Sequence, residues 1–173
     1  MEAVKVKIQI KATVTDLVQA ETYKNACVGG FFTTEDGRRL PSEEIASVCE
    51  EVIASSVTGE LREEAGRMTL IYRESEDLGF PCTTKLLFDT AAPEVITMVR
   101  SGGMNAAFRF DRRQPRQLCT YETPVMPIEF VVNTRSVRNT VDWEGGAILL
   151  DYCMEVRGVN TQRNRLFLEV QPL

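Results

Sequence analysis

The chain of 173 residues contains no histidine, and this absence removes most of the familiar chemistry of enzymes. Without histidine, neither a Ser-His-Asp nor a Cys-His catalytic site can be built, and a histidine-ligated zinc site is excluded as well. Five cysteines are scattered along the chain without a Cys-x-x-Cys pair, so a cysteine-only zinc site would have to gather them from distant segments. The common Gly-rich phosphate-binding loops are missing too. We therefore expect no metal and no cofactor.

Long apolar runs are also absent. No segment approaches the roughly 20 apolar residues of a membrane-spanning helix. The first residues, from Met1 to Lys7, alternate charged side chains with valine, which is typical of a strand rather than of a signal peptide. The odd number of unclustered cysteines favours reduced thiols. We expect a cytoplasmic protein that does not enter a membrane.

The net charge of −5 is distributed unevenly. Nine acidic and three basic residues fall between Glu35 and Glu64, so the remainder of the chain is close to neutral. Five arginines lie close together from Arg100 to Arg116. Because the segment 112–116 reads as a solvated hairpin loop without interleaved aromatic residues, we interpret it as a charged turn and expect no nucleic-acid partner.

What the chain does contain is a long series of strand patterns. Apolar residues alternate with lysine, glutamine and threonine from Val4 to Val14, which predicts a strand with one buried and one exposed face. This regular period of two favours antiparallel pairing. A second strand is expected from Glu21 to Thr34, with Gly29-Gly30 forming a bulge or a bend at a barrel corner.

From Met68 onward, strand patterns and turn residues follow one another at short intervals. Strands are expected at Met68–Ser75, Cys82–Asp89, Glu94–Ser101, Met104–Phe110, Gln117–Thr123, Ile128–Arg138, Ala147–Gly158 and Arg163–Gln171. Together with the two earlier strands they predict a meander that closes into an antiparallel barrel of about eight to ten strands. Closure removes the sheet edges at which chains aggregate. The expected fold is all-β, as one domain over residues 1–173.

Between these two groups of strands we expect an insertion, residues 35–67, that carries one amphipathic helix over residues 42–57. Ser42 can cap the helix, and two glutamates follow it where the helix dipole favours negative charge. Apolar residues recur at helical spacing up to Ile53 and form one stripe. Gly59 is placed to end the helix. We expect the stripe to pack on the outer wall or the open end of the barrel.

A set of short motifs gives the strand series a family resemblance. In chain order the motifs are Tyr72-Arg73-Glu74, Leu78-Gly79, Thr83-Thr84-Lys85-Leu86, Met98-Val99-Arg100-Ser101-Gly102, Tyr121-Glu122-Thr123-Pro124, and Gly145-Gly146 before Leu149-Leu150-Asp151-Tyr152. Their order and spacing resemble the YwiB-like family of bacterial domains of unknown function. The resemblance implies a calycin-type, lipocalin-like β-barrel, and it implies no activity. The chain departs from the family pattern at Val125-Met126-Pro127 and in its longer insertion.

Four residues on the predicted strands are candidates for a ligand site inside the barrel: Tyr72, Glu74, Arg100 and Tyr121. Glu74 shares a strand face with Tyr72, so an inward orientation would bury a carboxylate that needs a partner. Arg100 shares a face with Met98 and could supply that partner. The pair would then form a polar anchor at the bottom of a ligand cavity, or alternatively a structural ion pair or a group at the barrel rim.

The leading functional hypothesis is binding without catalysis, with a small, partly apolar molecule, an anionic one among the options, held inside the barrel. Small barrels are either filled by side chains or hold one small ligand, and a cavity of about 300 Å³ or more would favour the ligand. The alternative is a protein–protein interaction module, including a homodimer, that acts through a strand face or the inserted helix. An enzyme that uses carboxylates or cysteine without histidine is the third hypothesis.

Overall fold

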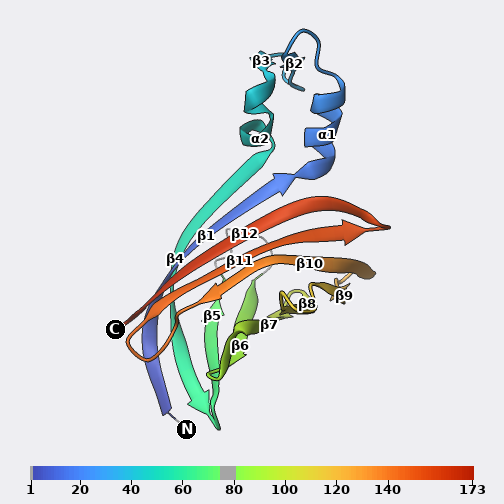
Figure 1. The fold of residues 1–173 in the computed structure, drawn as a ribbon. Helices are drawn as coiled ribbons and strands as arrows, with labels where there is room; N and C mark the ends of the chain where they lie inside the picture. The colour runs from blue at the N-terminus through green and yellow to red at the C-terminus, as the bar shows by residue number, and fades with distance from the viewer. Residues whose placement is uncertain (1, 75–80) are drawn as a thin grey trace.

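The computed structural model describes residues 2–74 and 81–173. Within them, ten strands form one closed antiparallel barrel in the order β1-β12-β11-β10-β9-β8-β7-β6-β5-β4, and β4 pairs back onto β1 (Figure 1). The barrel strands are β1 (Glu2–Asp16), β4 (Glu50–Glu64), β5 (Arg67–Arg73), β6 (Cys82–Asp89), β7 (Ala92–Gly102), β8 (Asn105–Phe110), β9 (Arg116–Glu122), β10 (Pro127–Asn139), β11 (Gly146–Val156) and β12 (Val159–Pro172). The predicted all-β, lipocalin-like antiparallel barrel is confirmed.

The period-two pattern of the sequence explains why these segments close into a barrel. On β1, Val6, Ile8 and Ile10 are buried, whereas Lys7 and Gln9 between them are exposed. On β6, Leu86 and Phe88 are buried in the same alternating manner. From β4 to β12, each strand pairs with the next one along the chain, and β1 closes the ring between β4 and β12. The apolar face of each barrel strand therefore points into one shared interior.

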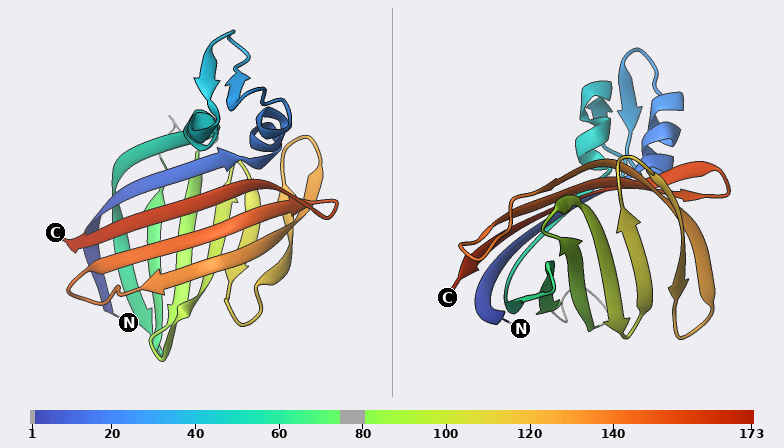
Figure 2. Two further views of the ribbon diagram at one scale, coloured as in Figure 1. Left: turned by 45° about the horizontal axis from the view of Figure 1, so that its top comes forward. Right: turned by 60° about the horizontal axis from the view of Figure 1, so that its bottom comes forward.

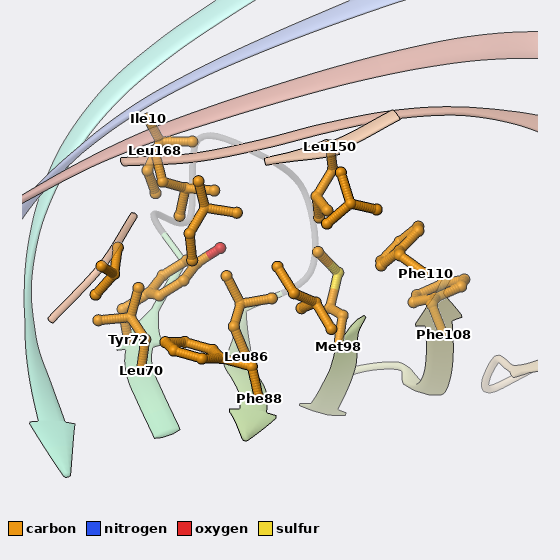
Figure 3. Close-up of a cluster of buried hydrophobic side chains, with 14 of the residues drawn as sticks. Ile10, Leu70, Tyr72, Leu86, Phe88, Met98, Phe108, Phe110, Leu150 and Leu168 are labelled. Atoms are coloured by element: carbon orange, nitrogen blue, oxygen red, sulfur yellow. The ribbon is translucent and has the colours of Figure 1, made fainter. Parts of the chain in front are cut away.

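The apolar core fills one end of the barrel, which we name the packed end. This end carries the hairpins β4–β5, β6–β7 and β10–β11. Figure 3 shows how side chains from opposite walls meet there. Trp143, in the β10–β11 connection, donates a hydrogen bond of 3.1 Å from Nε1 to Glu63 Oε2 on β4. The side chains that are less than 2% exposed include Ile8, Leu61, Leu70, Leu86, Ile96, Phe110, Leu150 and Leu168.

The opposite end of the barrel, which we name the insertion end, carries the hairpins β7–β8, β9–β10 and β11–β12. It also carries the segment between β1 and β4, residues 17–49, which projects from the barrel as a small unit (Figures 1 and 2). This insertion consists of α1 (Leu17–Asn25), β2 (Phe31–Thr33), β3 (Arg39–Pro41), a 3₁₀ turn (Ser42–Glu44) and α2 (Ile45–Val48). It has a core of its own, formed by Tyr23, Phe32 and Cys49.

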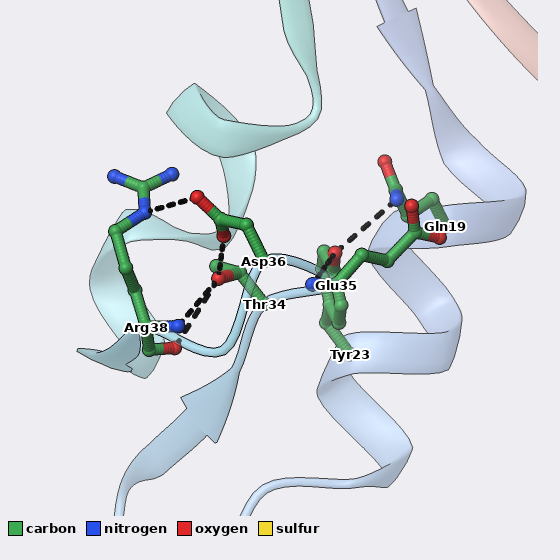
Figure 4. A network of polar contacts seen from close by, with 6 residues as sticks. All are labelled: Gln19, Tyr23, Thr34, Glu35, Asp36 and Arg38. Atoms are coloured by element: carbon green, nitrogen blue, oxygen red, sulfur yellow. Dashed lines mark hydrogen bonds and ion pairs between the residues drawn. The ribbon is translucent and has the colours of Figure 1, made fainter.

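Local hydrogen bonds hold the insertion together (Figure 4). The Tyr23 hydroxyl on α1 accepts hydrogen bonds of 3.2 Å from Gln19 Nε2 and of 3.2 Å from the backbone N–H of Glu35. In the β2–β3 turn, the Thr34 hydroxyl accepts a bond of 3.0 Å from the backbone N–H of Arg38. These bonds tie the turn to α1 and satisfy backbone groups that no strand ladder reaches.

The predicted second strand from Glu21 to Thr34 is wrong. Its first part belongs to α1, which begins after Asp16, and the Asp16 side chain caps the helix by accepting from a backbone N–H three residues later. Gly29-Gly30 lies at positive φ and forms the turn that leads into β2, so it is not a barrel corner. Only the three residues of β2 keep the strand conformation expected for this segment.

The predicted helix over residues 42–57 is wrong after α2, because β4 begins two residues beyond its end. Along β4, Ile53 and Leu61 lie on the inward face at a period of two, and the strand pairs with both β1 and β5. Val52, Ile53, Val57 and Thr58 are β-branched, and such residues favour strands over helices. The insertion therefore covers residues 17–49 rather than 35–67.

The other expected strands agree closely with the structure. Those from Cys82 onward correspond to β6–β12, and their ends differ from the observed ones by at most four residues. Ser75, the last residue of the strand expected over 68–75, and the Leu78-Gly79 motif lie outside the described residues. Within residues 2–74 and 81–173, no helix is long and apolar enough to cross a membrane.

Candidate functional site

A cavity of about 520 Å³ lies in the half of the barrel nearer the insertion end. The side chains that line it occupy inward-facing positions of the same strands that supply the core, but they lie farther along each strand. Its apolar wall includes Ile10 of β1, Met98 of β7 and Phe130 of β10. The four residues predicted as a ligand site, Tyr72, Glu74, Arg100 and Tyr121, all line this one cavity.

Strand register brings the predicted residues into one row across the barrel wall. Tyr72 on β5 lies opposite Thr84 on β6, and Thr84 lies opposite Arg100 on β7. Arg100 in turn lies opposite Ala106 on β8, which lies opposite Tyr121 on β9. Because Ala106 has only a methyl side chain, the guanidinium of Arg100 can pass over it and reach Tyr121. The row is thus a consequence of the meander register.

Glu74 and Arg100 form the polar centre of the row. The Glu74 carboxylate accepts a hydrogen bond of 2.8 Å from the Thr84 hydroxyl through Oε1 and is ion-paired with Arg100 Nη2 through Oε2. The Arg100 Nη1 donates to the Tyr121 hydroxyl. The two charged side chains are only 14% and 19% exposed, so the pair is largely removed from solvent. The geometry fits a structural ion pair and a polar anchor equally, since the pair also faces the cavity.

Three buried hydrogen-bond donors of cavity-lining side chains have no acceptor among the described residues. These are Arg100 Nε, Asn164 Nδ2 and Arg165 Nε. Asn164 lies on β12, where its Oδ1 accepts a bond of 3.0 Å from Gln162 Nε2 and so leaves the amide N–H groups free. Buried donors are normally hydrogen-bonded, because leaving one unpaired costs on the order of 1–3 kcal/mol. All three donors belong to side chains that line the cavity, and none is satisfied by a described residue.

Tyrosine hydroxyls add further polar groups to the walls. Burial raises the pKa of Tyr152 on β11 to about 12, and burial likewise raises the pKa of Tyr72 and of Tyr121. These phenols are therefore neutral near pH 7 and can donate a hydrogen bond. Burial works to lower the pKa of Arg100, but the neighbouring Glu74 and Tyr121 outweigh it, and the net pKa lies above its ordinary value. Arg100 is therefore a permanent cation.

The pKa of Tyr152 has a consequence for stability at high pH. An exposed tyrosine titrates near 10, whereas the folded protein holds the Tyr152 proton up to a pKa of about 12. The stabilisation is therefore complete below about pH 10 and is lost as the pH rises toward 12. We expect the free energy of unfolding of Tyr152→Phe to fall less steeply over this window than that of the wild type. Urea unfolding at a series of pH values measures both slopes, and equal slopes would contradict the assignment.

Tyr152 and Asn164 are among the polar residues of this site that sequence reasoning missed. Both lay on strands that were predicted, and each occupies the inward phase of its strand. Asn164 offered a signal, because it is a polar residue in step with Leu166 and Leu168, which point into the barrel. Tyr152 offered a weaker one, since an inward tyrosine cannot be distinguished from ordinary core by its pattern alone.

The other clusters noted in the sequence do not form a comparable site. Arg116 pairs with Glu155 at 3.2 Å, and Arg109 lies 3.8 Å from Asp111, so these arginines are partly neutralised on the barrel surface. Arg112 is exposed in the β8–β9 connection. In the part of the chain that the structure describes, no three cysteine, aspartate or glutamate side chains are grouped as a metal site would require.

Comparison with known proteins places this barrel among relatives. The family described as "Domain of unknown function (DUF1934)" matches residues 42–168, which is well over half of the chain. The chain belongs to this family. The match confirms the resemblance to YwiB-like domains. It also includes all of β4, so part of the segment first assigned to an insertion lies within the matched residues.

A solved member of the same fold is the crystal structure of the ywiB protein from Bacillus subtilis. It is 18% identical to this chain, with a TM-score of 0.68, and the match covers 99% of this chain and 93% of that one. At this identity the similarity shows the barrel fold alone. No match was found among the curated proteins.

Proposed function

We propose that this protein binds a small, partly apolar molecule inside its barrel and does not transform it chemically. The observation that carries the proposal is the cavity of about 520 Å³, a size within the range of roughly 300–1,000 Å³ that small-molecule sites have. Its walls include many aliphatic and aromatic side chains, with polar groups around Arg100 and, on the opposite wall, at Gln162, Asn164 and Arg165. Sites for partly apolar ligands combine an apolar wall with a few orienting polar groups in this way.

The single carboxylate of the cavity favours binding over catalysis. Among the described lining residues, Glu74 is the only acid, and its two oxygens are engaged by Thr84 and Arg100. Carboxylate enzymes generally need two such groups whose environments drive their pKa values apart. The cysteines give no alternative nucleophile here, since none is among the described lining residues. We therefore propose a binding protein rather than an enzyme.

The state of the cysteines favours a reducing compartment as the place of action. All five are unpaired, and four of them are buried. Free thiols persist where glutathione and thioredoxin keep them reduced. We propose that the protein acts in the cytoplasm.

Native mass spectrometry of freshly purified protein tests the proposed function directly. The expected spectrum contains a species heavier than the bare chain by the mass of one retained small molecule. Organic extraction should release this molecule, and its mass should match the difference. The same spectrum reports how many chains the particle contains.

A cavity-filling variant gives the second test. Ala12 on β1 lines the cavity between Ile53 and Leu166, so the ring of Ala12→Phe should occupy the ligand space. We expect wild-type protein to enhance the fluorescence of the neutral apolar probe N-phenyl-1-naphthylamine at one site per chain, and Ala12→Phe to abolish that enhancement. The control is Ala54→Phe, the same change at an exposed position of the neighbouring strand β4. Equal probe binding by wild type and Ala12→Phe would contradict the proposal.

An interaction module remains a second candidate because of one exposed apolar feature. In the β9–β10 hairpin, at the insertion end, Val125 is 89% exposed and Met126 is 60% exposed. Exposed apolar groups of this kind are common at contacts between proteins. A native mass of two chains that returns to one chain in Val125→Ser/Met126→Ser would favour homodimerisation through this hairpin.

A further inference from the structure

The charged groups at the cavity cancel in pairs. Among its described lining residues, only Glu74, Arg100 and Arg165 carry a charge near neutral pH. Glu74 compensates Arg100 through the ion pair, and Arg165 Nη2 is paired with Glu50 Oε1 at 2.8 Å. The cavity therefore contains no cation whose charge is left for a ligand to neutralise. This balance of charge argues against an anionic ligand, which the sequence alone allows.

The hydrogen-bonding groups of the cavity do not cancel as the charges do. The buried side-chain atoms there that lack a partner in the described part of the chain are donors. Arg100 Nε, Asn164 Nδ2 and Arg165 Nε are buried donors without an acceptor among the described residues. The Tyr121 hydroxyl already accepts from Arg100, so its own proton is directed to another acceptor. By strand order, Asn164 on β12 lies across the barrel from Arg100 on β7, so side chains with an unpaired donor line the cavity on both walls.

We infer that the ligand carries an uncharged head group that accepts hydrogen bonds, such as the carbonyl of an amide, ester or ketone, on an apolar body. The inference rests on the proposed function, and it names the ligand class for the same cavity. A carbonyl oxygen needs donors and brings no charge, which matches what the walls offer. A carboxylate would bring a second buried negative charge close to Glu74, and no free cation would compensate it.

Two ligands with the same chain length separate these cases. Octanamide has an uncharged carbonyl head group, and octanoate has a carboxylate. Each is used to displace N-phenyl-1-naphthylamine from the wild type at pH 7.5. We expect octanamide to displace the probe at a concentration at least about tenfold lower than octanoate does, since an uncompensated buried charge costs at least that factor in affinity.

A charge change at Glu74 then distinguishes a head-group effect from simple solubility. Glu74→Gln keeps the shape of the side chain but leaves the Arg100 cation uncompensated, so we expect octanoate to bind at least about tenfold more tightly than to the wild type. Octanamide should change less than about threefold. The matched control is Glu129→Gln, which makes the same charge change at an exposed position on β10 and should alter neither ligand.

Arg100→Gln provides the opposite charge change and keeps the test informative if Glu74→Gln fails to fold. It leaves Glu74 without a cation, so the ratio of octanoate affinity to octanamide affinity should fall below its wild-type value. The inference is overturned if octanoate binds the wild type as tightly as octanamide does, or if neither charge change moves the ratio. A wild type that fails to bind N-phenyl-1-naphthylamine at all would instead contradict the proposed function.

Discussion

Replacing Phe110 by alanine is expected to lower the free energy of unfolding by about 3–5 kcal/mol. The Phe110 side chain is 0% exposed, on the strand β8, where it lies opposite Ile96 of β7. Its ring centroid lies 4.7 Å from that of Tyr152 and 6.3 Å from that of Phe108. Removing the ring deletes contacts to both walls and leaves a void that the barrel strands, held by their ladders, can close only in part.

Urea unfolding followed by circular dichroism measures this loss, and a matched control lies on the outer surface. Phe167 on β12 is 41% exposed and points away from the core, so Phe167→Ala should cost less than about 1 kcal/mol. Equal losses for the two substitutions would show that Phe110 is not at the centre of a packed interior. The barrel interior would then have to be arranged differently from the one described.

The second large effect is expected at the ion pair. Arg100→Leu leaves the Glu74 carboxylate inside the barrel without its cation and removes the donor to the Tyr121 hydroxyl. Breaking a buried pair on one side costs roughly 3–5 kcal/mol, and the residual exposure of this pair places the expected loss near the lower end, at about 3 kcal/mol. The loss arises mainly from the unpaired carboxylate and only in part from the missing attraction.

A double-mutant cycle tests that explanation. If the unpaired carboxylate causes the loss, Glu74→Leu combined with Arg100→Leu should be more stable than Arg100→Leu alone, by about 2 kcal/mol. Chemical unfolding of the wild type, both single variants and the double variant gives the coupling energy. A double variant at least as unstable as the sum of the two single ones would mean that the two side chains act independently.

The barrel could be predicted from sequence because period-two patterning needs no knowledge of the partner strand. The alternation on β1 and on β6 is sufficient to assign a buried face, and the short turns then leave a meander as the simplest connection. The insertion was harder to predict. The apolar residues from 45 to 53 recur at helical spacing, and only pairing with β1, which the local sequence does not reveal, makes residues 50–53 the start of the strand β4.

The candidate site was predictable in its residues but not in its surroundings. Tyr72, Glu74, Arg100 and Tyr121 stand out because each places a polar group on a face that is otherwise apolar. Their proximity follows from the register of five consecutive strands, which the hairpin lengths fix only in three dimensions. The cavity itself depends on side-chain volumes summed over strands from the whole chain, and no local pattern encodes that sum.

The most direct test of a ligand-binding cavity uses the methionines as reporters. Met98, Met104 and Met154 line the cavity, whereas Met68 is buried in the core and Met126 is exposed. In a ¹H–¹³C spectrum of methyl-labelled protein, bound N-phenyl-1-naphthylamine should shift the signals of the three cavity methionines through its ring currents and leave that of Met68 in place. Shifts at Met126 or Met68 without any at Met98, Met104 and Met154 would contradict the account.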